Sequence, residues 1–300
     1  MMLKKYLLLF GIGLIWGSQF IFQKAALTSF SPEIVGAGRA IVGFITLSII
    51  CLIMNLKPRS KTSWWLYMLI GFLEATVPFV LVPWGQQYLS SAITSILIGT
   101  IPFFVVLFTP FLNANDKVTK SNVISLIVGF IGIVVLFAPD LLKGGSAFDY
   151  RGPLAILAAA ASFGLALLLL SRCSGEQPII VARNVLGSAS FQLLLVSLLT
   201  QSVVPGVITT KSIVSILYLG IMCAGVVYLL YMMLIVAAGP VFTSLTNYLV
   251  PTFGVFIGVL FAHDSISIYT WSALVIILLA VAINQRPSRD NKLVADSGAH

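Results

Sequence analysis

The chain has 300 residues, of which 59% are hydrophobic and only 9% are charged, and its formal net charge is +8. Its mean hydropathy of +1.07 excludes an ordinary soluble domain, because such a domain needs a polar surface. The composition therefore predicts an integral membrane protein. The positive charge does not indicate nucleic-acid binding, because lysine and arginine lie in short loops and at the two ends of the chain rather than in one patch.

Ten apolar segments are each close to the roughly 20 residues that cross a bilayer as a helix. They are residues 6–23, 34–54, 64–84, 92–112, 122–138, 154–171, 179–200, 213–235, 241–262 and 268–284. The longest polar join, 139–152, separates the fifth segment from the sixth. The sequence thus predicts an all-α polytopic membrane protein with ten transmembrane helices, in two five-helix repeats (6–138 and 153–284), followed by a disordered tail at 285–300.

The distribution of basic residues predicts the orientation. With ten spans both ends of the chain lie on one side of the membrane. That side carries 11 of the lysines and arginines that lie outside the spans, and the opposite side carries four. Because cytoplasmic loops are rich in these residues, we expect both termini to be cytoplasmic. The short loops favour a bacterial inner membrane.

Cysteine and histidine offer no obvious metal site. Cys51, Cys173 and Cys223 lie in or beside apolar segments without a CxxC pattern, and both His263 and His300 lie outside these segments. We therefore expect no metal and no cofactor. The first apolar run follows a basic start, but it is long and no A-x-A site follows it, so we interpret it as a retained helix rather than a cleaved signal peptide.

The second half of the chain echoes the first. A shift of 149 positions gives five identities in a window of 13 residues, including Thr94 with Thr243 and Pro102 with Pro251; chance would give about one. Because a proline inside a helix removes one hydrogen bond and bends the helix, Pro102, Pro251 and also Pro78 are candidate hinges. Each half has an odd number of spans, so the repeats are inverted, as in transporters whose binding site lies near the midplane.

Four stretches, in this order, resemble one family of membrane carriers. They are WGSQFIFQKAAL in the first span, Arg39 near the start of the second, YLSSAITSILIGTIPFFVVLF leading into the fourth, and AAGPVFTSLTNYLVPTFGVFIGVLF at the ninth. Together they resemble the EamA family of ten-helix carriers in the drug/metabolite transporter superfamily, from about residue 6 to residue 284. The resemblance implies secondary transport of small metabolites, often amino acids or related compounds, through a central cavity lined by both halves.

Glu74 is the only acidic residue inside a predicted span, near the middle of the third. A carboxylate at that depth costs about 3 kcal/mol and usually faces a cavity or a partner. Pro78 stands four residues later and leaves the Glu74 carbonyl without its helical donor. These acceptors suit a substrate ammonium or a transported proton, so Glu74 is a candidate for substrate binding and for proton coupling. The alternative is a protonated Glu74 hydrogen-bonded to a neighbouring helix.

Arg39 and Arg183 occupy matching positions in the two halves, each about one turn inside its span. They are candidate anchors for a substrate carboxylate. The alternative is that each reaches the interface or pins the carbonyl end of a neighbouring helix. A symmetric pair favours the structural alternative slightly, because a substrate needs only one anchor.

Two further spans present polar side chains at helical spacing. In the first span Trp16, Gln19 and Gln23 share one stripe, which we expect to face the cavity. In the ninth span Pro251 frees the carbonyl of Asn247, so Asn247 is a candidate hydrogen-bonding group for substrate. The alternative in both cases is a polar contact between helices.

The sequence predicts a transporter rather than an enzyme. No histidine lies in a span, and no GxSxG, HExxH or paired-carboxylate pattern appears. We expect a secondary transporter that moves an amino acid or related amphoteric solute by alternating access. The alternative class is a membrane-embedded enzyme or scaffold subunit that acts on lipid. The expected partners are a small-molecule substrate and the lipid bilayer, without nucleic acid, and the protein is expected to be a monomer or homodimer.

Overall fold

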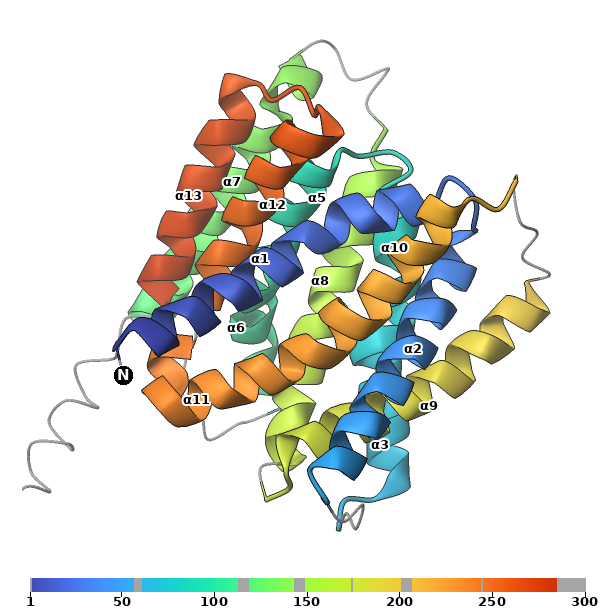
Figure 1. Ribbon diagram of the computed structural model, residues 1–300. Coiled ribbons are helices and arrows are strands. Elements are labelled where there is room, and N and C mark those ends of the chain that lie inside the picture. The colour runs from blue at the N-terminus through green and yellow to red at the C-terminus, as the bar shows by residue number, and fades with distance from the viewer. Residues whose placement is uncertain are drawn as a thin grey trace, which may run out of the picture.

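The computed structural model describes residues 2–56, 61–112, 119–142, 149–173, 175–200, 207–243 and 245–284, and these form helices with no strand (Figure 1). Eight of the described helical segments are long and apolar enough to cross a membrane, and two more apolar helices are shorter. The all-α membrane class is therefore confirmed, and the helices are compatible with ten spans. The expected tail at 285–300 and residues 143–148 of the expected central loop lie outside the described residues.

The helices follow the predicted segments along the chain. The first half gives α1 (Met2–Ala26), α2 (Pro32–Ile53), α3 (Trp64–Gly71), a π-helical turn (Phe72–Thr76), α4 (Val77–Gly85), α5 (Ser91–Ile98), α6 (Ile101–Leu112) and α7 (Lys120–Leu142). The second half gives α8 (Arg151–Leu170), a 3-10 turn (Ser171–Cys173), α9 (Pro178–Leu199), α10 (Thr210–Ile221), a π-helical turn (Met222–Val226), α11 (Val227–Thr243), α12 (Thr246–Ala262) and α13 (Ile268–Asn284). Most boundaries differ from expectation by a few residues. The larger differences are that α7 continues through Pro139 and that α11 includes residues 236–243, which the prediction divided between a join and the ninth span.

The third and eighth predicted spans carry matching irregularities. In the third, the N–H of Val77 donates to the carbonyl of Phe72, five residues back, and closes a π-helical turn just before Pro78. In the eighth, the N–H of Val227 donates to the carbonyl of Met222 in the same way. A π-helical turn adds one residue to the helix and so redirects the side chains around it. Both halves of the chain therefore distort the corresponding helix at the corresponding place.

The two duplicated prolines lie in different local structures. The fourth predicted span breaks at Gly99 and Thr100, and Pro102 occupies the first turn of α6, where its missing N–H costs nothing. Pro251 instead lies inside the continuous helix α12. The fourth span is thus two helices, α5 and α6, rather than one bent helix.

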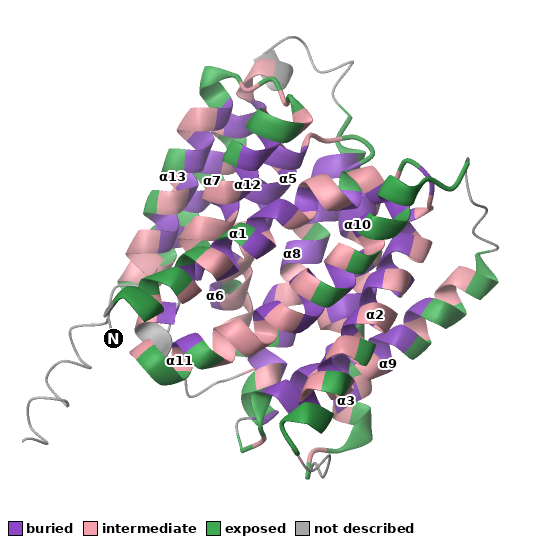
Figure 2. Cartoon of the chain, in the orientation of Figure 1, coloured by how far each residue is buried: buried purple, intermediate pink, exposed green. Residues whose placement is uncertain are grey.

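Helices from the two halves of the sequence pack against one another. α2 packs on α9, α7 on α13, α5 on α12, and α4 on α8, while α1 crosses α12 and also contacts α10 and α11. Figure 2 shows buried residues dominating α5, and exposed residues gathering toward the C-terminal end of α9. The exposed residues include large apolar side chains such as Phe130 and Leu198, a surface that suits lipid rather than water.

The crossing of α1 and α12 depends on two glycines one turn apart. A Cβ atom at Gly17 would lie 2.6 Å from the Cβ of Phe253 and 3.0 Å from the backbone nitrogen of Gly254. A Cβ at Gly13 would lie 2.7 Å from the Cβ of Leu249. Small residues let membrane helices approach this closely, since lipid tails offer helices no hydrophobic drive to associate. This crossing holds α1 beside the second half of the chain.

Substitution of Gly17 tests this crossing. We expect Gly17→Ala to lower the free energy of unfolding by about 1–3 kcal/mol, because the new methyl group meets backbone atoms that cannot move aside. Gly11→Ala is the matched control on the same helix, because no atom lies within 4 Å of its Cβ position. Thermal unfolding of the detergent-purified variants measures the difference, and equal stability of the two variants would contradict the close crossing.

Candidate functional site

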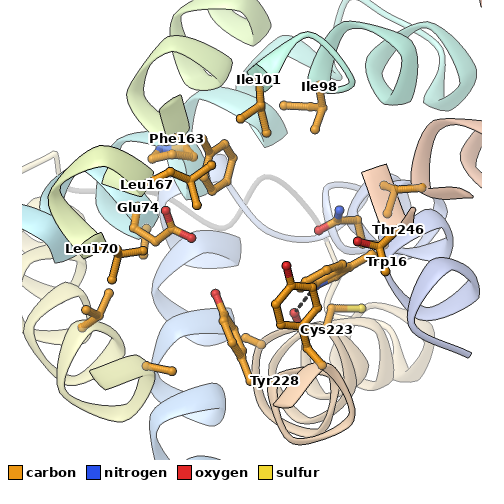
Figure 3. Close-up of a pocket in the computed structure, with 18 of the residues that line it drawn as sticks. Trp16, Glu74, Ile98, Ile101, Phe163, Leu167, Leu170, Cys223, Tyr228 and Thr246 are labelled. Carbon is orange, nitrogen blue, oxygen red and sulfur yellow. Dashed lines mark hydrogen bonds between the residues drawn. The ribbon is translucent and has the colours of Figure 1, made fainter. Parts of the chain in front are cut away.

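A cavity of about 520 Å³ lies between helices of both halves of the chain (Figure 3). Its volume is in the range of about 300–1,000 Å³ that is typical of small-molecule sites. Its walls come from α1, α2, the first π-helical turn, α4, α5, α6, α8, α9, the second π-helical turn, α11 and α12. Most lining residues are apolar, with a few polar groups among them, as expected of a site that binds small solutes.

The cavity reaches one end of the helix bundle. Glu176 and Pro178, in the connection from α8 to α9, line it there together with Thr246 and Asn247 at the start of α12. This is the end at which α1 begins (Figure 1). Asn247 therefore lies near the mouth of the cavity, where a solute would enter or leave.

Contacts between helices close the opposite end. The Asp264 carboxylate, after α12, accepts the N–H of Ala92 at 3.0 Å, and the Lys24 ammonium lies 4.0 Å from it. Nearby, the Arg151 guanidinium stacks over Tyr88 and bonds both carboxylate oxygens of Asp149, which holds the pKa of that carboxyl below its usual value. These contacts join α1, α5 and α12 and fix the start of α8 beside the α4–α5 connection.

Glu74 lies in the first π-helical turn and projects into the cavity (Figure 3). Its Oε2 atom is buried and has no hydrogen-bond partner, and no ion pair involves this carboxylate among the described residues. The alternative of a hydrogen bond from Glu74 to a neighbouring helix is therefore absent from the described part of the chain. Its counterpart in the second turn is Cys223, which also lines the cavity.

Arg39 lines the cavity from α2. It is only 9% exposed, its Nη2 atom donates to the Oε1 atom of Gln19 at 2.8 Å, and its guanidinium lies 4.2 Å from the centre of the Phe79 ring. Its Nε atom is buried without a hydrogen-bond partner. Gln19 and Phe79 thus hold a cation whose remaining hydrogen-bonding capacity is free.

Arg183 occupies different surroundings from Arg39. Its Nε atom donates to the Oγ atom of Ser48 at 3.2 Å, its guanidinium lies 5.8 Å from the Phe44 ring, and it does not line the cavity. Arg183 on α9 therefore joins α2, which agrees with the structural alternative for this residue. The two arginines occupy matching positions in the sequence repeat, but their surroundings in the structure differ.

The polar stripe of α1 only partly faces the cavity. Trp16 and Gln19 line it, whereas Gln23 does not. Gln23 is 1% exposed, and neither atom of its amide has a hydrogen-bond partner in the described structure. The Gln86 amide donates to the carbonyl of Phe20, directly after Gln19, and Gln23 lies one turn nearer the closed end. The expectation of a cavity-facing Gln23 is therefore corrected.

Aromatic residues of α11 complete the wall opposite Glu74. The Trp16 ring contacts the rings of Tyr228 and Tyr231, with centroids 6.3 Å and 5.6 Å apart, and its Nε1 atom donates to the Cys223 carbonyl at 3.2 Å. Figure 3 shows the Tyr228 hydroxyl and the Glu74 carboxylate pointing into the same space. Sequence reasoning missed both tyrosines. Their signal was two phenols three residues apart inside an apolar span, a spacing that places them on one helix face.

The three candidate hinges are also wall residues. Pro78, Pro102 and Pro251 all line the cavity, and Pro251 accepts a long bond from the Ser95 hydroxyl at 3.4 Å. Prolines therefore surround the site on three segments. The described residues contain no group of three or more histidine, cysteine, aspartate or glutamate residues that could hold a metal ion.

Two glutamines of α1 provide a matched test of these contacts. We expect Gln19→Leu to destabilise the protein by about 2–3 kcal/mol, because it removes the acceptor of a buried guanidinium. Gln23→Leu should be neutral or stabilising, because its amide has no partner to lose. Thermal unfolding in detergent measures both variants. A larger loss for Gln23→Leu would show that Gln23 holds a polar contact and that Gln19 does not support Arg39.

Comparisons with known proteins agree with this arrangement. The transporter YoaV of Bacillus subtilis, named as uncharacterized, is 24% identical over 94% of this chain and 97% of its own length. The protein PecM of Dickeya dadantii is 26% identical over 88% of each chain, and the uncharacterized inner membrane transporter YedA of Escherichia coli K12 is 22% identical over 92% of this chain and 88% of its own length. A solved structure titled "Crystal structure of protein" has the same fold, with a TM-score of 0.67 over 93% of this chain and 94% of that chain at 17% identity.

The family model described as the EamA-like transporter family matches this chain twice, at residues 3–138 and 150–285. The two matched regions meet in the central loop, close to the division that the sequence repeat indicates. Together they cover nearly all of the chain that the helices occupy. The chain therefore belongs to the EamA-like transporter family.

Proposed function

We propose that the protein is a secondary transporter that carries an amino acid or related amphoteric solute across the bacterial cytoplasmic membrane by alternating access. Family membership and relatives named as transporters support a carrier of small solutes rather than an enzyme. The finer assignment, to an amphoteric solute, comes from the charges inside the cavity.

One observation carries the proposal: a carboxylate and a guanidinium line the same cavity without pairing. Glu74 and Arg39 each keep a buried polar atom without a hydrogen-bond partner, and neither belongs to an ion pair among the described residues. Buried charges of this kind are costly unless something neutralises them. A solute with both an ammonium and a carboxylate supplies both missing partners at once.

The inverted repeat supplies a route for alternating access. We propose two five-helix repeats, 6–138 and 153–284, that change their packing around the central cavity. The cavity reaches the end of the bundle where α1 begins, and contacts among α1, α5 and α12 close the other end. In this proposal the structure is the state open to the cytoplasm, since both termini are assigned to that side.

Glu74 is the residue that we assign to proton coupling. It lies among apolar and aromatic neighbours such as Leu167 and Tyr228, and its carboxylate keeps a free acceptor (Figure 3). A carboxylate in this position can hold either a proton or a substrate ammonium. Competition between the two would couple movement of the solute to movement of protons.

Replacing the carboxylate tests its role. We expect Glu74→Gln to abolish counterflow of amphoteric solutes in proteoliposomes, or to abolish its pH dependence, while the protein remains folded. The neutral amide keeps the size of the side chain but can neither pair with an ammonium nor release a proton. Transport that stays unchanged and pH-sensitive would remove Glu74 from the mechanism.

The two arginines separate binding from helix pinning. Arg39→Lys should lower transport of an amphoteric solute by at least about tenfold, because an ammonium cannot replace the planar fork of a guanidinium. Arg183→Lys is the matched control and should retain transport, because Arg183 lies outside the cavity. The same assay is repeated with two analogues of the solute, an amine that lacks the carboxylate and an acid that lacks the ammonium. Their transport shows whether the protein recognises both charges. Equal transport of all three solutes would contradict the proposed function.

Single cysteines test the orientation. In a cysteine-free background, an impermeant thiol reagent added outside the cell should label Lys211→Cys, at the start of α10, and not Lys61→Cys, before α3. Both positions are exposed. Reporter fusions to the two ends should both report the cytoplasm. Ends on opposite sides of the membrane would contradict an even number of spans and the inverted repeat.

A further inference from the structure

We infer that the solute carried through this cavity has a bulky apolar side group beside its amphoteric head, and that α8 selects for that group. The inference rests on the function proposed above and adds the class of side group. It comes from the wall of the cavity that carries no charge.

The face of α8 toward the cavity is apolar. Phe163, Leu167 and Leu170 line the cavity at spacings of four and three residues, which place them on one face of the helix. Figure 3 shows them next to Glu74, with Ile98 and Ile101 adjoining them. They form a continuous surface, the α8 wall, defined by Phe163, Leu167 and Leu170.

The α8 wall is only partly covered by other side chains of the protein. Leu167 is 47% exposed although it faces the interior cavity, and Phe163 and Leu170 are only partly buried. Phe163 and Leu170 pack partly against buried apolar clusters, and the rest of this surface faces the cavity. An apolar group that covers it leaves water, which is favourable roughly in proportion to the area removed.

The repeat shows that this composition is particular to one half. A shift of 144 residues pairs Ser18 with Ser162, so Phe163 and Leu167 stand where α1 has Gln19 and Gln23. α1 therefore presents an amide that holds Arg39, and α8 presents only hydrocarbon at the equivalent places. The two helices give the cavity one polar wall and one apolar wall.

Charge and wall together define the shape of the solute. Glu74 adjoins the α8 wall (Figure 3). Arg39 and Gln19 line the cavity from α2 and α1. A head held between the two charges can extend its side group along the α8 wall. A cavity of about 520 Å³ leaves room for this group, whereas a small or polar solute would leave the apolar wall exposed to water.

Selectivity in counterflow tests the inference. Proteoliposomes are loaded with alanine, glutamine, leucine or phenylalanine, and entry of the labelled solute is measured. We expect leucine and phenylalanine to have half-saturation concentrations at least about tenfold below those of alanine and glutamine, because even one methylene in an apolar site changes specificity by about that factor. Glutamine is the sharp comparison, since it is close to leucine in size but has a polar end.

Variants of the α8 wall identify its role. Phe163→Ala and Leu167→Ala should each raise the half-saturation concentration for phenylalanine about tenfold and leave that for alanine within about twofold. Leu154→Ala is the matched control, because Leu154 is on the same helix, is 57% exposed and does not line the cavity. Two wall variants are used so that misfolding of one leaves the other to be measured.

The outcomes separate this inference from the proposed function. Transport that favours alanine or glutamine, or wall variants that keep the wild-type selectivity, would overturn the inference and leave the amphoteric carrier standing. If none of the four solutes enters, the proposed function and this inference both fail. Selectivity that depends equally on Leu154 would overturn the assignment to the α8 wall.

Discussion

The constraint on which the site depends is the cost of placing charge inside an apolar bundle. Glu74 and Arg39 both line a cavity inside the helix bundle, and a charge there costs several kcal/mol unless water, a partner or a ligand compensates it. The chain compensates only partly: Gln19 and Phe79 hold the guanidinium, and the carboxylate has no partner among the described residues. In the function that we propose, a solute that pairs with both charged groups removes this free-energy cost.

The backbone places these charges by interrupting regular helix. The π-helical turn at residues 72–76 adds one residue before Pro78 and puts Glu74 on the cavity side, while Phe72 in the same turn is 47% exposed on the outer surface. In the second π-helical turn the Cys223 carbonyl accepts the indole N–H of Trp16, whose ring contacts that of Tyr228. Irregular backbone in a membrane protein is tolerated where it lines a cavity, and here both irregular turns do so.

Much of this arrangement could be predicted from the sequence. The parts that could not be predicted have one physical reason in common. Hydropathy located the helices because a bilayer requires long apolar segments. The isolated carboxylate Glu74 indicated the cavity because a buried charge in a membrane span usually faces a cavity or a partner. Which face of a helix meets the cavity depends on partners distant in sequence. Arg39 and Arg183 are equivalent in the repeat, but Gln19 and Ser48 give them different roles. Gln23 shares a stripe with Gln19 but is buried outside the cavity, and the tyrosines of α11 line the cavity in contact with Trp16 of α1.

The two ends of the bundle show how the two halves of the chain differ in packing while their sequences correspond. At the closed end α1 packs on α5, and α2 lies so close to α4 that a Cβ at Gly36 would be 2.5 Å from the Phe79 carbonyl oxygen. At the open end no comparable packing joins α8 to α12 among the described residues, and the cavity mouth lies between them. The shift of 144 makes α8 the counterpart of α1, and the shift of 149 makes residues 240–247, where α11 gives way to α12, the counterpart of α5. Corresponding segments of the two halves are therefore packed in two different ways. In the mechanism that we propose, exchange of these two packings would close the mouth and open the sealed end. The difference between matching contacts, rather than the sequence repeat alone, is therefore the argument for proposing alternating access.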